Sequence, residues 1–280
     1  MKAIVLTGLR RMEMREIPDP AIENDSDVLL RVKAVGVCGS DVHYYLTGRI
    51  GSQVVSYPYR VGHEFAAEVQ EVGSAVERVR PGDRVAVDPA MSCGKCDQCR
   101  AGRPHTCRKL RFLGCPGQAE GCLSELIVMP DVTCFPVGQN TTYEQAAFVE
   151  PLSIGIYAVR SSVPLRGKRI AILGCGPIGL SVLLPAVAGG AEAVYVTDPI
   201  PERLQVAGQA GATWCGNPTQ QDVVKEIEER EPLLLDAVFE CCGRQEALDQ
   251  SVRLLRPGGK LMLIGIPEVA RISFPIAYLR

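Results

Sequence analysis

Four cysteines that lie close together in the sequence have the spacing of a metal site. Cys93, Cys96, Cys99 and Cys107 form the pattern C-x2-C-x2-C-x7-C, with glycines between them that permit tight turns. Four thiolates are typical of a closed tetrahedral zinc site, which leaves no position for a substrate and therefore has a structural role. An iron–sulfur cluster and a set of unrelated cysteines are the alternatives. The spacing predicts a structural zinc lobe over residues 91–110.

A second group of possible ligands has a mixed chemistry. Cys38 follows an apolar run, and His63 and Glu64 stand just before another. One thiolate, one imidazole and one carboxylate would leave a coordination position open, where zinc can hold an alcohol or a water and lower its pKa. Each residue alone would be unremarkable, because a lone cysteine is usually a small buried hydrophobic side chain. Together they suggest a catalytic metal site.

A glycine-rich motif indicates that a dinucleotide binds. Gly174, Gly176 and Gly179 have G-x-G-x-x-G spacing, with Pro177 and Ile178 between the last two. The motif follows a β-rich apolar run and opens a helical stretch, which is the context that makes it specific. The first glycine permits the turn, the second lets the backbone approach a pyrophosphate, and the third lets helix and strand pack closely. The helix N-terminus then meets the negative charge.

Two charged residues bear on the choice of dinucleotide. Asp198 ends the next apolar run, where a carboxylate can accept hydrogen bonds from the adenosine ribose and would repel a 2′-phosphate. Arg203 could favour a phosphate if it turned toward the ribose. With Asp198 in place, the sequence favours NAD over NADP.

Short strands are expected to position the mixed metal group. Up to about Asp88, apolar residues alternate in steps of two and are separated by turns such as Pro81-Gly82-Asp83, which argues for antiparallel sheet. Residues 91–129 have too little apolar periodicity for a core of their own, so a metal could order them. We predict an antiparallel partial β-barrel domain at residues 1–150.

The second half of the chain has a different pattern of apolar and helix-capping residues. Thr142 and Gln145 have the spacing of a capping box, and Pro151 can open a helix, which places the domain boundary near this helix. Beyond Lys168, β-rich runs alternate with helical stretches. This alternation predicts parallel strands with helical crossovers, a doubly wound sheet at residues 151–280.

Two features of this second domain stand out. A six-stranded dinucleotide-binding sheet would need one more strand after Gly265, so we expect the domain to be incomplete. Pro185 lies inside the helix that follows the glycine motif, where it removes a hydrogen bond. The sequence offers no functional reason for this proline.

Composition excludes several classes of partner. The 280 residues carry a formal net charge of -2, so no overall positive field would hold nucleic acid or an anionic membrane. The first apolar run is too short for a signal-peptide core, and no segment is long enough to span a bilayer. Twelve cysteines without an export signal indicate reduced thiols that can bind metals. We therefore expect a cytoplasmic protein whose partner is a small neutral molecule.

Four short motifs connect the two halves of the chain to a known family. They are Cys38-Gly39-Ser40-Asp41-Val42-His43-Tyr44, Gly48-Arg49-Ile50-Gly51, Gly62-His63-Glu64 and Glu150-Pro151-Leu152-Ser153. These motifs closely resemble the sorbitol and xylitol dehydrogenases of the zinc-dependent medium-chain dehydrogenase/reductase family. The resemblance implies an α/β protein with a GroES-like partial β-barrel catalytic domain and a Rossmann domain that binds NAD. It also implies that the chain oxidises a secondary alcohol of a polyol to a ketose.

The same resemblance implies the ligands of the catalytic zinc. Cys38 and His63 would bind the ion. Glu64 and Glu150 would supply carboxylates, one directly and one through water. Which of the two carboxylates is the direct ligand stays open at this point.

The resemblance also implies residues that handle protons and substrate. Ser40 would contact the substrate hydroxyl and pass its proton toward the nicotinamide ribose and His43, and an imidazole suits such a relay. Tyr44 and Phe112 fall where the resembling enzymes line the polyol pocket. For Tyr44, packing of a helix against the barrel is the alternative role.

Other functions share most of these features. Threonine, butanediol and simple alcohol dehydrogenases of the same family have the same two zinc sites, while the run 48–51 and Glu150 favour a polyol. A truncated, non-catalytic form that binds NAD and zinc is the alternative from another class, because the resembling proteins continue beyond the position of Arg280. For a full-length chain, the resemblance implies a homo-oligomer, either a dimer or a tetramer.

Overall fold

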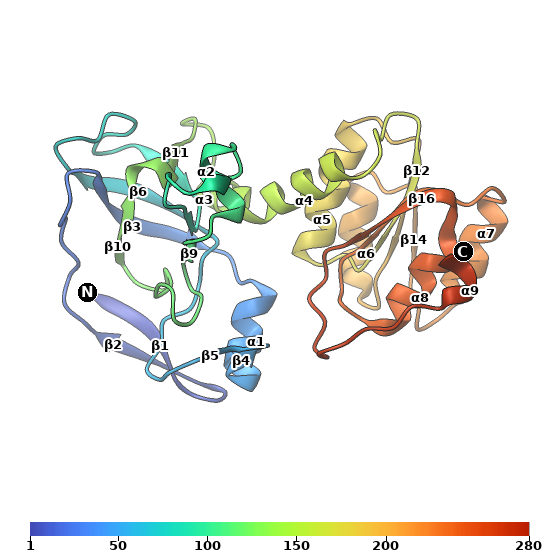
Figure 1. Cartoon of the computed structure of the whole chain (residues 1–280), viewed down its shortest axis with the longest axis horizontal. Helices are drawn as coiled ribbons and strands as arrows, with labels where there is room; N and C mark the ends of the chain where they lie inside the picture. Colours follow the sequence, from blue (N-terminus) through green and yellow to red (C-terminus); the bar gives the residue numbers. More distant parts are fainter. Residues whose placement is uncertain (280) are drawn as a thin grey trace. The chain divides into compact units, whose positions relative to one another are not determined.

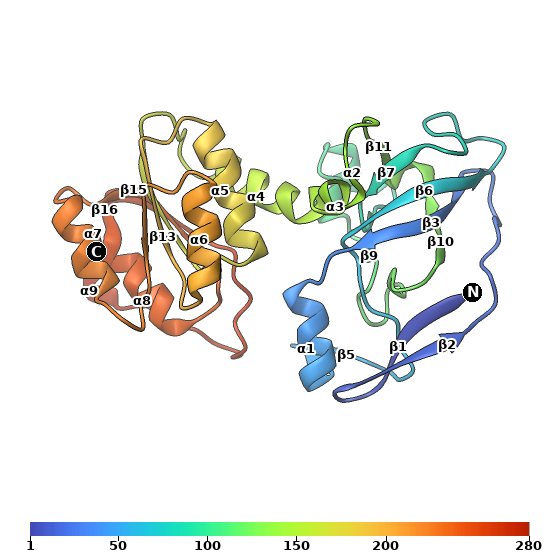
Figure 2. The same ribbon diagram turned by 180° about the vertical axis from the view of Figure 1, so that it is seen from behind.

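The structure is a computed structural model that describes residues 1–279, and the contacts within it divide the chain into two compact units (Figures 1 and 2). The first unit is Met1–Glu150 and the second is Pro151–Arg280. Each has a hydrophobic core of its own. The first unit is mainly antiparallel sheet, and the second alternates parallel strands with helices.

A five-stranded antiparallel sheet forms the centre of the first unit. In order across the sheet, the strands are β10 (Leu126–Pro130), β3 (Asp27–Val35), β6 (Phe65–Val72), β7 (Arg84–Val87) and β11 (Cys134–Pro136). The two-residue alternation of β3 buries Val28 and Leu30 on one face, where they join Phe65 and Met129 in the core. This arrangement confirms the antiparallel β architecture predicted from the sequence.

Shorter elements surround this sheet. Helix α1 (Gly39–Thr47) packs through Tyr44 onto Leu6 and Val61 in a satellite core. The remaining elements of the first unit before residue 140 are β1 (Lys2–Gly8), β2 (Arg11–Glu16), α1 (Gly39–Thr47), β4 (Arg49–Ile50), β5 (Gln53–Val54), β8 (Ala90–Met91), α2 (Asp97–Arg100), η1 (Pro104–Thr106), β9 (Arg111–Phe112) and η2 (Asp131–Thr133).

The predicted capping box opens helix α3 (Tyr143–Ala147). The backbone N–H of Gln145 donates to the Thr142 hydroxyl oxygen at 3.2 Å, and the Gln145 side chain accepts from the Thr142 N–H at 3.0 Å. Helix α4 (Val149–Ser161) then begins two residues before Pro151 rather than at it. Proline is tolerated there because the first N–H groups of a helix have no partner within it.

The second unit is built on a five-stranded parallel sheet, and its alternating side chains face two layers of helices. Across the sheet the strands are β14 (Trp214–Gly216), β13 (Ala193–Thr197), β12 (Arg169–Leu173), β15 (Leu235–Glu240) and β16 (Leu255–Leu263). The helices are α5 (Pro177–Ala188), α6 (Pro201–Gln209), α7 (Val223–Arg230), α8 (Gln245–Leu254) and α9 (Ile276–Leu279). Ile170 and Ile172 of β12 pack with residues of α5 and α6, whereas Ala171 and Leu173 pack with residues of α7 and α8. The sheet is therefore covered on both faces, as in a doubly wound fold.

Pro185 has a structural explanation that the sequence did not reveal. Helix α5 continues through it to Ala188, and a proline at this position has no N–H for the carbonyl of Ser181. Gly155 of α4 lies against that same carbonyl, so closely that a Cβ atom on Gly155 would stand 1.8 Å from the Ser181 oxygen. The proline thus leaves a carbonyl without its helical bond at the place where α4 and α5 come into contact.

Among residues 1–279, no helix combines the length and the apolar character needed to cross a bilayer.

Candidate metal and cofactor sites

The mixed ligand group of the first unit is brought together by two segments that are distant in sequence. Cys38 stands directly before α1, while His63 and Glu64 stand directly before β6. One possible ligand atom from each of the three lies within 4.8 Å of the others. His63 and Glu64 are buried, and Cys38 is half-buried. The backbone N–H of Gly36 donates to the Glu64 carbonyl at 2.6 Å, which ties the end of β3 to the start of β6.

Asp41 holds two of these segments in place, and sequence reasoning had assigned it no role. Its carboxylate accepts hydrogen bonds from the backbone N–H of Cys38 at 3.1 Å and of Gly62 at 3.0 Å. It also lies 3.9 Å from Nδ1 of His63. A carboxylate in this place orients a ligating imidazole and its neighbours. The available signal was position, because Asp41 is the third residue of the helix that Cys38 begins, where side chains reach back to the N-cap.

Burial disfavours charge throughout this group. It raises the pKa of the Cys38 thiol to about 11, although hydrogen bonds from Ser40 act in the opposite direction. Burial also raises the pKa of Glu64 and lowers that of His63, whose shift is opposed by the charge of Asp41. A cation would offset the cost of ionising the thiol and the carboxylate, and a neutral imidazole keeps a lone pair for it. The donor set and its environment therefore fit a zinc ion with one open position.

Glu150 lies outside the three-residue group but close to its charges. It is the second residue of α4, and its carboxylate is not among the atoms that cluster with Cys38 and His63. Burial raises its pKa to about 8, and the nearby charge of Glu64 adds to the shift. Of the two carboxylates that the sequence left open, the geometry brings Glu64 to the ligand cluster.

The residues expected to handle proton and substrate are on α1 and β9. Ser40 and His43 are three residues apart on α1 and so share a helix face. Tyr44 is almost fully buried in the satellite core, and its hydroxyl donates to the Gln53 side chain at 3.0 Å, so it packs α1 against the barrel. Phe112 is on β9, with its ring centroid 5.3 Å from that of His63 in an edge-on arrangement. The ring of Phe112 therefore borders the candidate metal site.

The four cysteines of the lobe also converge. One possible ligand atom of each lies within 4.8 Å of the others, with Cys96 Sγ 3.5 Å from Cys99 Sγ and 3.9 Å from Cys107 Sγ. The backbone N–H groups of Cys93 and Lys109 each donate to Cys107 Sγ at 3.3 Å. Such N–H···S contacts stabilise a thiolate and fix its orientation toward a metal ion. All four positions come from one short loop region, so the lobe closes locally.

The glycine motif turns between β12 and α5. Gly174 has a φ of 93°, which a side chain would strain. A Cβ atom on Gly179 would stand 2.0 Å from the Gly174 carbonyl oxygen, so only glycine permits this approach of helix to strand. Gly176 is the N-cap of α5, and Pro177 and Ile178 form its first turn. The helix N-terminus is therefore presented at the carboxyl end of β12, where an anion binds well.

Asp198 is fixed at the neighbouring strand end. It is 2% exposed, and its carboxylate accepts from the N–H of Cys175 at 2.7 Å and of Ile200 at 2.9 Å. Arg203 Nη1 lies 3.5 Å from the same carboxylate. The loop after β15 also reaches this place, since a Cβ on Gly174 would stand 2.8 Å from Cβ of Cys242. Sequence reasoning missed this loop, although the carboxyl ends of adjacent parallel strands meet at one edge.

Comparison with known proteins extends over both units. Residues 24–139 match the alcohol dehydrogenase GroES-like domain, and residues 177–279 match the zinc-binding dehydrogenase domain. The chain is 39% identical over 280 residues to sorbitol dehydrogenase of Bacillus subtilis (strain 168), covering 100% of this chain and 79% of that protein. It is 35% identical over 268 residues to L-idonate 5-dehydrogenase of Vitis vinifera, covering 94% of this chain and 73% of that protein.

Solved structures of zinc-binding and butanediol dehydrogenases are also similar to this chain. A zinc-binding dehydrogenase from Sinorhizobium meliloti 1021 bound to NADP has a TM-score of 0.89 and 33% identity, covering 99% of this chain and 80% of that one. The 2R,3R-butanediol dehydrogenase from Bacillus subtilis has a TM-score of 0.86 and 33% identity, covering 99% and 80%. These likenesses confirm the fold class, and they support zinc and a nicotinamide dinucleotide as the cofactors.

Proposed function

Because the chain belongs to the zinc-dependent medium-chain dehydrogenase family, we propose that it oxidises a secondary alcohol of a polyol to a ketose and reduces NAD. The observation that carries this proposal is the group of Cys38, His63 and Glu64, whose possible ligand atoms lie within 4.8 Å of one another. The polyol class is supported by relatives named for sorbitol and L-idonate.

Different residues of the chain would bind the metal, transfer the proton and contact the substrate. Cys38, His63 and Glu64 would hold the catalytic zinc, and Glu150 would act as a second carboxylate beside them. When bound, zinc supplies a Lewis acid for the alcohol oxygen, and the nicotinamide supplies the acceptor for the hydride. The Ser40 hydroxyl would take up the alcohol proton and pass it to His43 along the same face of α1. Phe112, beside His63, would border the substrate.

The cysteine lobe is proposed to hold a second, structural zinc. Four thiol ligands from Cys93, Cys96, Cys99 and Cys107 fill a tetrahedral shell, so no position remains for a substrate. Two zinc ions per chain are therefore expected.

NAD rather than NADP is proposed on the strength of Asp198. Its buried carboxylate stands beside the glycine turn, where it would accept from ribose hydroxyls and repel a 2′-phosphate. Arg203 Nη1 lies 3.5 Å from that carboxylate, so the negative charge of Asp198 offsets the positive charge of Arg203. Asp198→Ala should raise the KM for NAD and lower the KM for NADP, and a wild-type enzyme that prefers NADP would contradict the proposal.

The central test combines metal analysis with a substrate panel. Cys38→Ser and His63→Ala should each lose polyol oxidation and about one of the two zinc ions, while the lobe keeps the other. Cys134→Ala is the matched control, because this thiol lies in the barrel core away from both metal groups. The panel contains sorbitol, xylitol, threonine, butanediol and ethanol. Full activity in both metal-site variants, or a preference for threonine or butanediol, would refute the assignment. NAD binding without turnover of any alcohol would instead favour a non-catalytic role.

Localisation and assembly are proposed on the family likeness alone. The chain is proposed to work in the cytoplasm, and a full-length chain is proposed to form a homo-oligomer, either a dimer or a tetramer. Light scattering on the purified protein would test the assembly, and a monomer at micromolar concentration would contradict it.

A further inference from the structure

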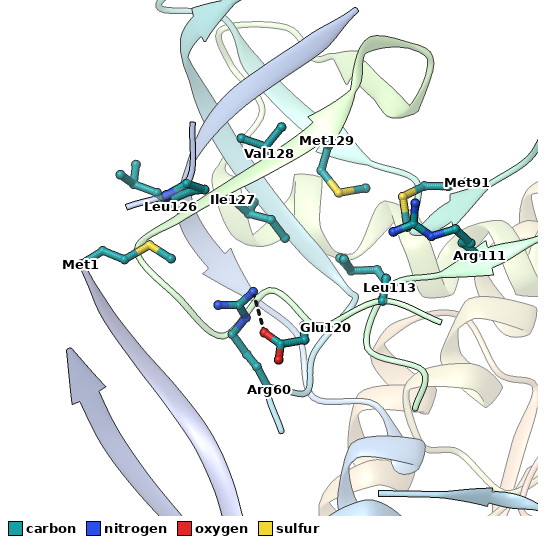
Figure 3. A pocket seen from close by; sticks show the side chains of 12 residues that line it. Met1, Arg60, Met91, Arg111, Leu113, Glu120, Leu126, Ile127, Val128 and Met129 are labelled. Atoms are coloured by element: carbon teal, nitrogen blue, oxygen red, sulfur yellow. Dashed lines mark ion pairs between the residues drawn. The ribbon is translucent and has the colours of Figure 1, made fainter. Parts of the chain in front are cut away.

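The first unit contains a cavity whose lining residues include none of the candidate metal ligands. Its volume is about 260 Å³. Figure 3 shows side chains of β10 along one wall and those of Met91 and Leu113 on another. Much of the lining is aliphatic or thioether, and methionine side chains adapt easily to the shape of a ligand. The cavity is larger than the roughly 150 Å³ apolar cavity that admits one benzene ring.

Two arginines give this apolar cavity a positive character. Arg60 lines it and pairs with Glu120 at 3.2 Å, while its Nε donates to the Gly121 carbonyl at 2.6 Å. Arg111, an exposed residue, also lines it, and its Nε donates to the Gln118 carbonyl at 3.4 Å. Within residues 1–279, no carboxylate lies at ion-pair distance from Arg111. The lining therefore holds two guanidinium groups and one carboxylate. Figure 3 shows Leu113 between the two arginines.

Other charged groups also lie near the cavity, and the carboxylates of Asp19, Glu125 and Glu16 all act on the ammonium of Met1. The ammonium of Met1, which also lines the cavity, is held by Asp19 at 2.6 Å and by the Ile17 carbonyl at 2.8 Å. Glu120 has a side chain that is 58% exposed, so it can move aside into water. Its pairing with Arg60 indicates the kind of group that the cavity accepts, because guanidinium groups bind planar carboxylates well.

We propose that this cavity is a binding site for a small amphipathic monocarboxylate. The ligand's apolar tail would lie against Met91, Met129 and Ile127, and its carboxylate would bind Arg111 and compete with Glu120 for Arg60. A neutral polyol would give Arg111 no charged partner and would cover the apolar walls poorly, so the site differs in chemistry from the metal site. The binding itself does not depend on the proposed dehydrogenase activity.

Two segments that line the cavity also carry residues of the candidate metal site. Arg111 and Leu113 face the cavity, whereas Phe112 between them is directed to His63 with ring centroids 5.3 Å apart, as alternation along a strand requires. On the other side, Arg60 is two residues before Gly62, whose N–H is held by Asp41. Two walls of the cavity thus continue directly into segments of the metal site. A ligand there should change the KM for the polyol, a consequence that rests on the proposed function.

Binding is tested with octanoate and the full zinc-loaded chain by isothermal titration calorimetry. The expected result is saturable binding of about one octanoate per chain, with octanol and octylamine binding at least tenfold more weakly. Arg111→Gln should weaken octanoate binding at least tenfold. Ala119→Leu, which adds bulk to the lining, should abolish it. Lys109→Gln is the charge control, since Lys109 is exposed and not part of the lining, and it should bind like the wild type.

Several outcomes would overturn the proposal. Absence of saturable octanoate binding at millimolar concentration would do so, as would equal binding of octanol or an unchanged affinity in both cavity variants. Octanoate should also shift the polyol KM with the half-saturation found by calorimetry, and binding without such a shift would overturn the coupling to the metal site. Because calorimetry needs no turnover, an inactive chain that still binds octanoate would count against the dehydrogenase assignment and not against this site.

Discussion

Replacement of Asp41 by asparagine tests how the metal site is assembled. The Asp41 side chain is 6% exposed and accepts from two backbone N–H groups with its two oxygens, one for Cys38 and one for Gly62. These N–H groups belong to the two segments that carry the candidate ligands Cys38 and His63. Asp41→Asn keeps the size of the side chain but turns one of the two acceptors into a donor.

The expected cost follows from the hydrogen bonds. One buried N–H loses its acceptor and meets an NH₂ group, which costs about 1–3 kcal/mol. A domain is typically stable by only about 5–15 kcal/mol, so the loss is a substantial fraction of the total. Loss of an outer partner of a metal ligand typically lowers metal affinity or activity by about 10–100-fold. Asp41 is therefore a positioning residue, and its substitution should affect both the stability and the retention of zinc.

Two measurements on the same protein separate these effects. Urea unfolding of the zinc-loaded chain gives the stability, and competition with a chelator gives the affinity for the more weakly held ion. Asp222→Asn is the matched control, because a single oxygen of Asp222 accepts both the Val224 and Lys225 N–H groups at the start of α7. Asparagine keeps that oxygen and is an equally good N-cap, so the control should change stability by only a few tenths of a kcal/mol. If Asp41→Asn stays within about 0.5 kcal/mol of the wild type and retains zinc equally well, the reasoning is refuted.

Three further predictions concern the second unit and the lobe. Gly155→Ala should destabilise the protein by about 1–3 kcal/mol or more in urea unfolding, because its Cβ would meet the Ser181 carbonyl at 1.8 Å. Gly208→Ala on α6 meets nothing within 4 Å and should be neutral or stabilising by up to about 1 kcal/mol, so equal effects of the two changes would refute the packing argument. Burial alone would raise the pKa of Asp236, but the Arg169 N–H and the cations of Lys168 and Arg256 outweigh it and lower that pKa. A carboxyl whose pKa is lower in the folded state stabilises the protein above its unfolded pKa of 3.8, and this stabilisation is lost as the pH falls through the folded pKa. Asp236→Asn should therefore destabilise the protein at pH 7 and much less near pH 3. A difference in stability that does not depend on pH would contradict this. Cys96→Ser should release the structural zinc and make residues 91–110 more sensitive to proteolysis, while the zinc ion at Cys38 stays bound. Loss of both ions together would show that the two sites are not independent.

Much of the fold could be predicted because its signals are local. The capping box at Thr142 and Gln145 forms as predicted, since its partners are three residues apart. Parallel sheet in the second unit followed from alternating β-rich and helical runs. Element ends were less accurate, because α4 begins at Val149 and β16 extends back to Leu255, where pairing with β15 adds residues that lack a β-rich pattern.

The chemistry of the candidate sites could be predicted from the order of residues along the chain. The cysteine lobe and the glycine turn can be recognised from spacing, because each is closed by one short segment whose geometry depends on neighbouring residues. Other features depend on how the chain packs. The fold brings Glu64 into one cluster with Cys38 and His63. It also lets Asp41 bind the N–H of Gly62, and it places Gly155 against the Ser181 carbonyl, which lacks its helical bond because of Pro185. These contacts join residues about 20 or more positions apart, and such pairings depend on how strands and helices pack rather than on any local pattern.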